Sequence, residues 1–392
     1  MTAREPASSA DRVGTAPGHG GSSRQQTDII LAEVQTSSRA ATLTVEQRTP
    51  GIQTSRRARL RRYARLQELG LIVVLVIMVI YFSVYAPGFD TTANIKTIFM
   101  YSTVLGVLAI GQTLVILAGG FDLSNGAALA LASAVGATML AGGGNQVVAT
   151  IVTLAIGLGI GVLNGVLVAI LRVNAFIATL GTYLIFFGVA YVYTTSATVG
   201  FPLSKWGFYG RDSIGGIPVS VIIVGVLAAI VILILHFTVF GRGVYAVGGN
   251  PQAARMAGIP VKRYLVMVFA LSGLAAGVGA LIQASLAAAG SASFAGQLNL
   301  QSITAVILGG AALSGGEGGI VGSLLGVLIM EGIIDGTTLM NMSTYFQDVV
   351  TGIVLLLAVM LASWRAYISG RRVRVPAWMR ARHDRPASEV DG

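Results

Sequence analysis

Long runs of apolar residues follow one another through the central part of the chain, separated by short polar breaks. Most runs are about 17 to 25 residues long, and a helix of that length crosses a hydrocarbon core about 30 Å thick. No stretch shows the short alternating segments that a membrane-spanning barrel requires. The pattern therefore predicts an all-α polytopic membrane protein.

The polar breaks divide this region into about ten apolar segments. They are expected at roughly 69–87, 98–118, 126–142, 146–171, 174–196, 217–239, 263–288, 298–313, 319–338 and 346–365. Segments 126–142 and 298–313 are short, and short or broken helices enter a membrane only where irregular backbone is buried in protein or lines water. The transmembrane domain is expected at 66–368. The tails at 1–65 and 369–392 are polar and basic, and we expect them to be disordered and cytoplasmic.

Basic residues gather outside the apolar segments. Six arginines lie within residues 56–65, before the first segment, and six within residues 371–385, after the last one. With ten crossings, the loops on the outer side hold only Lys96, Lys205 and Arg211. Because Lys and Arg are retained on the cytoplasmic side, both termini are expected inside a bacterial plasma (inner) membrane. The formal net charge of +10 thus indicates orientation and contact with membrane lipid, and no nucleic-acid partner is expected.

The amino-acid composition argues against several kinds of functional site. The chain is 54% hydrophobic and 11% charged, with a mean hydropathy of +0.77, whereas soluble domains are about one-quarter charged. It has no cysteine and three widely separated histidines, so no metal site is expected. It lacks the phosphate-binding pattern G-x-x-x-x-G-K-[ST] and any arrangement typical of a hydrolase. We therefore expect a transport component that binds no cofactor of its own, and no enzyme.

One short segment recurs in the chain. Residues 116–126 read ILAGGFDLSNG and residues 306–316 read VILGGAALSGG, and the two align without a gap. Both follow a segment expected to run from outside to inside, so the repeat is expected to be parallel. Internal repeats with broken helices recur in transporters, where the unwound ends face the solute pathway. Glycine permits the positive φ angles and the close helix approach that such breaks need.

The first break carries a carboxylate, Asp122, between two lipid-compatible segments. An acid inside a membrane is costly unless it faces water or a partner. Two roles for Asp122 remain open, a helix cap at the start of 126–142 and a contact with the solute. Ser124 and Asn125 are also typical capping residues.

Polar side chains within the apolar segments carry groups that can hydrogen-bond a neutral solute. The candidates for the solute pathway are Gln112, Asp122, Ser124, Asn125, Asn164, Asn174, Thr179, Tyr183, Gln301, Thr304 and Ser314. Each of them could equally bond to the backbone of a neighbouring helix.

The polar connection at 240–264 predicts a short helix on the cytoplasmic side. Asn250 followed by Pro251 is typical of an N-cap and a first helical position, and Gly258 would end the helix. The helix body is rich in alanine, and Arg255 would project from it. Such a helix suits a groove on another protein, although an ordinary connector has the same pattern.

Five stretches together resemble the permease of ribose/xylose/galactose-type ABC importers, and they keep the order of that family. They read GQTLVILAGGFDLSNGAALAL, AFIATLGTYLIFFGVAYVYT, GRGVYAVGGNPQAARMAGIPV, AVILGGAALSGGEGGIVGSLLGVLI and YFQDVVTGIVLLLAV. The resemblance covers roughly residues 69–365. Phe121 and Glu317 depart from it, because the family usually has Ile and often Arg at these positions.

The resemblance implies a sugar importer that works by alternating access. Two permease chains, identical or related, would form the pathway, two cytoplasmic ATPase domains would bind ATP and Mg²⁺, and an extracytoplasmic binding protein would deliver the sugar. The loop at 240–264 resembles the family's coupling region to the ATPase. The expected coupling residues are Gly241, Arg242, Gly249, Asn250, Pro251, Ala254, Arg255 and Gly258, with Ile259 at the end of the motif.

A transporter of another class remains open on the residues alone. An ion-coupled secondary transporter of a small polar solute would use acids within the membrane, here Asp122, Glu331, Asp335 and Asp348. Glu331 and Asp335 are four residues apart and so share one helix face. In the ten-segment order, however, both approach the outer side, where water could solvate them.

Overall fold

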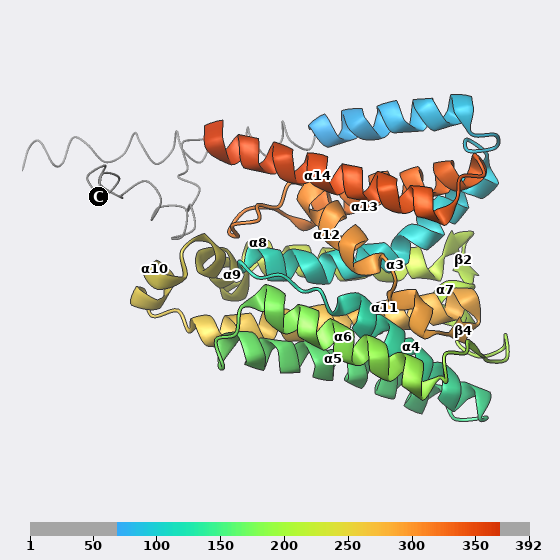
Figure 1. Cartoon of the computed structure of the whole chain (residues 1–392), viewed down its shortest axis with the longest axis horizontal. Coiled ribbons are helices and arrows are strands. Elements are labelled where there is room, and N and C mark those ends of the chain that lie inside the picture. The colour runs from blue at the N-terminus through green and yellow to red at the C-terminus, as the bar shows by residue number, and fades with distance from the viewer. Residues whose placement is uncertain (1–68, 369–392) are drawn as a thin grey trace, which may run out of the picture. The chain divides into compact units, whose positions relative to one another are not determined.

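The computed structural model describes residues 69–368, with side chains as far as residue 364, and these residues form a bundle of helices (Figure 1). The tails predicted at 1–65 and 369–392 lie outside the described residues. Within the described part, the only strands are four of two residues each. The prediction of an all-α protein is confirmed.

Each of the ten predicted apolar segments corresponds to a helix. These helices are Leu69–Tyr85, α3 (Thr92–Leu117), α4 (Asn125–Ala141), α5 (Gln146–Ala169), α6 (Ala175–Tyr193), α8 (Val219–Phe237), α11 (Val261–Ala287), α12 (Leu298–Leu308), α13 (Ile320–Leu339) and α14 (Thr344–Ile368). In the described part, seven of them are long and apolar enough to cross a membrane. Leu69–Tyr85, α4 and α12 are shorter. The number of crossings, about ten, stays a prediction.

The remaining elements are short and join the long helices. They are α7 (Gly207–Gly210), α9 (Val239–Gly249), α10 (Pro251–Met256), the 3-10 turn η1 (Ala292–Ala295), and the strands β1 (Val199–Gly200), β2 (Ser213–Ile214), β3 (Ile217–Pro218) and β4 (Ala289–Gly290). Strand β1 pairs antiparallel with β4, and β2 pairs antiparallel with β3. Helices α9 and α10 lie at one end of the bundle, and α7, β2 and β4 lie at the opposite end (Figure 1).

Helix α3 lies at the centre of the bundle. Every residue from Ser102 to Leu117 is buried, and α3 packs against α8, α11, α12 and α13. An apolar helix that is buried on all sides carries no amphipathic stripe, because it has no solvent or single core face to distinguish. The C-terminus of α3 is therefore held inside the protein, and the first sequence break begins there.

Helices α5 and α11 make the most extensive contact between helices in the described part. Gly157, Gly161 and Gly165 recur at every fourth residue of α5 and lie against the backbone of α11. A Cβ at Gly157 would lie 2.7 Å from the backbone nitrogen of Gly277, and one at Gly165 would lie 2.8 Å from the Cα of Val266. Small residues that let two backbones approach are a main source of helix association in membranes.

The two predicted breaks end their helices with the same turn. After α3 the left-handed residue is Gly119, with a φ of +83°, and after α12 it is Gly310, with a φ of +92°. In both cases the next N–H donates to the carbonyl five residues earlier, which is the Schellman motif that favours glycine. The ungapped sequence alignment pairs Gly119 with Gly309, so it is one residue out of register at the helix ends.

Candidate functional site

The segment between α3 and α4 holds the carboxylate of Asp122, which is 1% exposed. Its Oδ1 accepts hydrogen bonds from the backbone nitrogen of Ser124 at 2.9 Å and from Ser124 Oγ at 2.6 Å. Its Oδ2 accepts from Ser272 Oγ on α11 at 2.8 Å. The bond to a backbone N–H two residues ahead forms an Asx turn. Asp122 therefore shapes the break locally and also ties it to α11.

Side-chain bonds continue from this break to α5 and α6. Asn164 Nδ2 donates to Ser124 Oγ at 2.7 Å, and Thr182 Oγ1 donates to Asn164 Oδ1 at 2.8 Å. Thr179 Oγ1 donates to the Ala175 carbonyl of its own helix at 2.7 Å and lies 3.3 Å from the carbonyl of Phe121. The structure thus brings together four of the predicted pathway residues, Asp122, Ser124, Asn164 and Thr179.

A second polar cluster lies where α3, α4 and α12 meet. Asn125 Nδ2 donates to Gln112 Oε1 at 3.4 Å and to Ser302 Oγ at 3.3 Å. Ser302 gives its own proton to the Asn299 carbonyl at 2.8 Å, so it can only accept from Asn125. Gln112 Nε2 and Asn125 Oδ1 are then left buried without a protein partner. Such an atom costs about 1–3 kcal/mol unless a water or another hydroxyl bonds to it.

The other predicted pathway residues do not join these clusters. Asn174 caps the N-terminus of α6, and Tyr183 is half-buried and stacks on a ring within α6. Gln301 and Thr304 bond to groups within and just before α12, and Ser314 is exposed. Their part in a pathway stays a prediction.

The two breaks meet each other and the end of α9 through backbone atoms. The Gly316 N–H donates to the Leu117 carbonyl at 2.9 Å, which joins the second break to the end of α3. A Cβ at Gly315 would lie 2.8 Å from the Cα of Gly119 and 3.0 Å from the Cα of Gly248. We call this contact the glycine junction; it comprises Leu117, Gly119, Gly248, Gly249, Gly315 and Gly316.

Gly248 is the α9 member of this junction, and it has no room for a side chain. A Cβ there would overlap the Leu117 carbonyl and would lie 2.7 Å from the Gly316 nitrogen. A Cβ on the adjacent Gly249 would meet nothing within 4 Å. Tyr245, earlier on α9, donates its hydroxyl to the Gly318 carbonyl at 3.0 Å. Burial raises the pKa of the Tyr245 phenol, so the group stays protonated and remains a donor.

Helix α10 follows α9 with the capping that the sequence predicts. Asn250 Oδ1 accepts from the backbone nitrogens of Gln252 and Ala253 at 3.1 Å each, and Pro251 is the first helical residue. Beyond the helix, Gly258 adopts a φ of +79°. The predicted short helix and its capping at 240–264 are confirmed, whereas its contact with an ATPase stays a prediction.

The side chains of α10 divide into an inner and an outer set. Ala254 is 4% exposed and packs with Val247 of α9 and Val261 of α11, so it seats the helix on the bundle instead of facing a partner. Arg255 is exposed, and Met256 is 90% exposed. Met256 is not among the predicted coupling residues, although a large apolar residue in a polar loop is a signal for such a position.

Two further predicted coupling residues lie at the start of α9. Gly241 is buried, and a Cβ there would overlap the carbonyl of Leu235 at the end of α8. Arg242 is exposed. Gly241 thus permits the close approach of α9 to the end of α8, and Arg242 adds positive charge to the exposed surface of α9.

The acids considered for ion coupling lie apart from one another, except on α13. Asp335 Oδ2 accepts from Asn94 Nδ2 of α3 at 2.7 Å. Glu331 on the same helix is half-buried, Asp348 on α14 is exposed, and the Asp122 carboxylate already accepts three hydrogen bonds. Among residues 69–364, no group of three or more His, Cys, Asp or Glu side chains could hold a metal ion.

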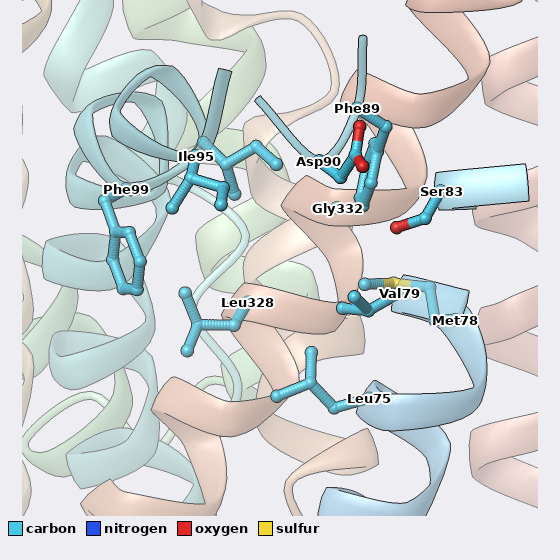
Figure 2. A pocket seen from close by; sticks show the side chains of 11 residues that line it. Leu75, Met78, Val79, Ser83, Phe89, Asp90, Ile95, Phe99, Leu328 and Gly332 are labelled. Atoms are coloured by element: carbon cyan, nitrogen blue, oxygen red, sulfur yellow. The ribbon is translucent and has the colours of Figure 1, made fainter. Parts of the chain in front are cut away.

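A cavity of about 270 Å³ opens between the Leu69–Tyr85 helix, the start of α3 and α13 (Figure 2). Its wall is mainly apolar, with Leu75, Met78 and Leu328 among the lining residues, and Ser83 and Asp90 lie on the same side of it (Figure 2). None of the predicted pathway residues lines it. A neutral polyhydroxyl solute needs several converging polar groups, so this cavity does not suit a sugar.

The apolar bundle, its two broken helices and the capped helix at one end are those of a multi-pass membrane protein. Residues 94–359 match the family described as Branched-chain amino acid transport system / permease component. The chain belongs to this family of ABC transporter permeases, which confirms the resemblance seen in the motifs.

Several relatives in this family carry the name of a sugar. Over 308 residues the chain is 38% identical to the ribose import permease protein RbsC of Escherichia coli (strain K12), covering 77% of this chain and 96% of that protein. It is 40% identical over 298 residues to RbsC of Bacillus subtilis (strain 168), covering 76% and 92%. It is 34% identical over 298 residues to the L-arabinose ABC transporter permease protein AraH of Azospirillum brasilense, covering 76% and 87%. No solved structure matches the chain.

Proposed function

We propose that this chain translocates a sugar or sugar-like solute into the cytoplasm, as the membrane subunit of an ABC importer powered by a separate ATPase. The names of the ribose and L-arabinose permeases support a sugar as the solute. The observation that carries the proposal is the arrangement of α9 and α10, which pack together as one unit. It exposes Arg255 and Met256 at one end of the bundle and contacts both helix breaks with Gly248.

The proposed assembly has a second permease chain, identical or related, a cytoplasmic ATPase that binds ATP and Mg²⁺, and an extracytoplasmic sugar-binding protein. Both termini and α10 lie on the cytoplasmic side of the bacterial inner membrane. The basic residues Arg242, Arg255 and Arg263 support this orientation, because they are exposed on or beside α9 and α10.

Neutral hydrogen-bonding groups would serve a sugar better than a free charge. The Asp122 carboxylate points its oxygens at Ser124 and Ser272, and so it holds the break in shape. Gln112 and Asn125 retain an unpartnered donor and an unpartnered acceptor beside the same break. These amides are the pathway candidates whose chemistry suits a hydroxyl group, once the bundle opens around them.

Membership of an ABC permease family favours the ATP-driven class over the ion-coupled secondary transporter. Asp335, one of the two acids that share a face of α13, is engaged by Asn94. A carboxylate fixed by an amide in this way is an interhelical tether, and it is a weaker candidate for an ion site than a carboxylate that faces water.

The test is uptake into proteoliposomes that contain the full chain with its ATPase and binding protein. The labelled solutes are D-ribose, L-arabinose and, because of the family's description, L-leucine. We expect uptake of a sugar that requires ATP and the binding protein. Sugar uptake by the chain alone under a proton gradient, or ATP-driven uptake of L-leucine and of neither sugar, would contradict the proposal.

A further inference from the structure

We propose that α9 is the transmission element of this transporter, and that Gly248 passes the movement of α10 to both helix breaks at once. The inference rests on the proposed function, because it assigns the route by which the ATPase would act on the pathway. It adds Gly248 and Tyr245 as positioning residues, in addition to the surface of α10 that is expected to contact the ATPase.

The first step is that α10 cannot move without the end of α9. Asn250 is both the C-cap of α9 and the N-cap of α10, so no flexible linker separates the two helices. Ala254 of α10 is buried with Val247 of α9 in one apolar cluster. A displacement of α10 is therefore delivered directly to the last turn of α9, which contains Gly248.

The second step is that Gly248 touches both breaks. Its Cα has no room for a methyl group, since a Cβ would overlap the Leu117 carbonyl and lie 2.7 Å from the Gly316 nitrogen. Leu117 ends α3, and Gly316 lies in the segment before α13, and the two are bonded to each other. Closely packed protein transmits a displacement instead of absorbing it. A shift of Gly248 therefore reaches the two breaks together.

A second contact fixes α9 to the later break. Tyr245 lies nearly one turn before Gly248 on α9 and donates its hydroxyl to the Gly318 carbonyl at 3.0 Å. This contact lies beyond Gly316 along the chain, close to the start of α13. With two points of attachment, the segment before α13 follows both the translation and the tilt of α9.

The third step leads from the junction to the polar clusters. The break that starts at Leu117 continues to Asp122, Ser124 and Asn125, whose side chains bond to α5, α11 and α12. Movement at Gly248 would thus change the surroundings of Asn125, one of the two amides that are proposed to face the sugar.

The experiment compares Gly248→Ala with Gly225→Ala on α8, a matched control because Gly225 lies outside the glycine junction and the added methyl group would meet nothing within 4 Å there. Each variant is assembled with the ATPase and binding protein in proteoliposomes, and solute uptake and ATP hydrolysis are measured in the same sample. We expect Gly248→Ala to lower the uptake per ATP hydrolysed by about tenfold or more, because overpacking shifts the backbone at the contact. Gly225→Ala should match the unaltered chain.

Tyr245→Phe is the second variant, since it removes one hydrogen bond and keeps the ring. We expect it to lower the uptake per ATP by about two- to tenfold, within the range of one such bond, with the thermal unfolding temperature nearly unchanged. Equal ratios for Gly248→Ala and Gly225→Ala overturn the inference. If Gly248→Ala does not assemble, an unchanged ratio for Tyr245→Phe overturns it instead. The ratio is taken with whichever solute the unaltered complex carries, so a wrong solute class contradicts the proposed function alone.

Discussion

The backbone N–H of Gly316 donates to the carbonyl of Leu117 at 2.9 Å, and this bond joins two segments that share a sequence pattern. Leu117 belongs to the first break and Gly316 to the second, and they lie far apart in the chain. Because Gly248 packs on the same two groups, the repeat and the predicted coupling loop meet at one place.

Asp122 is expected to be a structural requirement of the first break. Asp122→Ala removes the acceptor of three buried hydrogen bonds and leaves Ser124 and Ser272 without it. We expect the free energy of unfolding to fall by about 3 kcal/mol or more, because each buried donor left unpaired costs about 1–3 kcal/mol. The measurement is denaturant unfolding in detergent micelles. Asp348→Asn, at an exposed acid, is the control, and a drop for Asp122→Ala no larger than for this control would contradict the assignment.

The contact between α5 and α11 should be sensitive to single methyl groups. A Cβ at Gly161 would overlap the Phe269 carbonyl, whereas one at Gly159 meets nothing within 4 Å. We expect Gly161→Ala to destabilise the fold by about 1–3 kcal/mol through overpacking. Gly159→Ala should be neutral or slightly stabilising, because alanine is the better helix former. The thermal unfolding temperatures of the two variants decide the matter, and similar values would show that the helices are not so closely packed.

The outer face of α10 should matter for the ATPase and not for the fold. Met256→Glu changes a side chain that is 90% exposed, so the unfolding temperature of the isolated chain should stay within about 1 °C, as is usual for a surface substitution. Co-purification with the ATPase should be lost, because an apolar side chain that is expected to become buried at the interface with the ATPase would be replaced by a charge. Ala254→Glu should instead lower the unfolding temperature of the isolated chain, because Ala254 is buried against the bundle. Full retention of the ATPase by Met256→Glu would remove the docking role.

Local patterns in the sequence predicted local structure well. The cap and first turn of α10 depend on Asn250, Pro251 and Gly258, which lie within a few residues of one another. Most helix bounds likewise follow from runs of apolar residues to within three positions, but the predicted start of α3 is six residues late and the predicted end of α12 is five residues late. The one-residue error in the repeat arose because an alignment matches identities, whereas the turn depends on where the helix ends, and that point puts Gly119 opposite Gly310.

Contacts between distant segments could not be predicted in the same way. Nothing near Ser272 in the sequence indicates that its hydroxyl bonds to Asp122, because the pairing is made by the packing of α11. Gly248 and Gly249 look alike in the sequence, and only the space around each distinguishes them. Ala254 is among the expected coupling residues, and its burial could not be predicted because a short alanine-rich helix has no periodicity strong enough to orient it.

The central claim, that α10 meets a separate cytoplasmic ATPase, can be tested most directly with one introduced thiol. The chain contains no cysteine, so Met256→Cys provides a unique reactive group on an exposed position. We expect a membrane-impermeant thiol reagent to label it only from the cytoplasmic side, and a short thiol cross-linker to join it to the ATPase in the assembled complex. Labelling from the outer side, or the absence of any cross-link to the ATPase, would contradict the account.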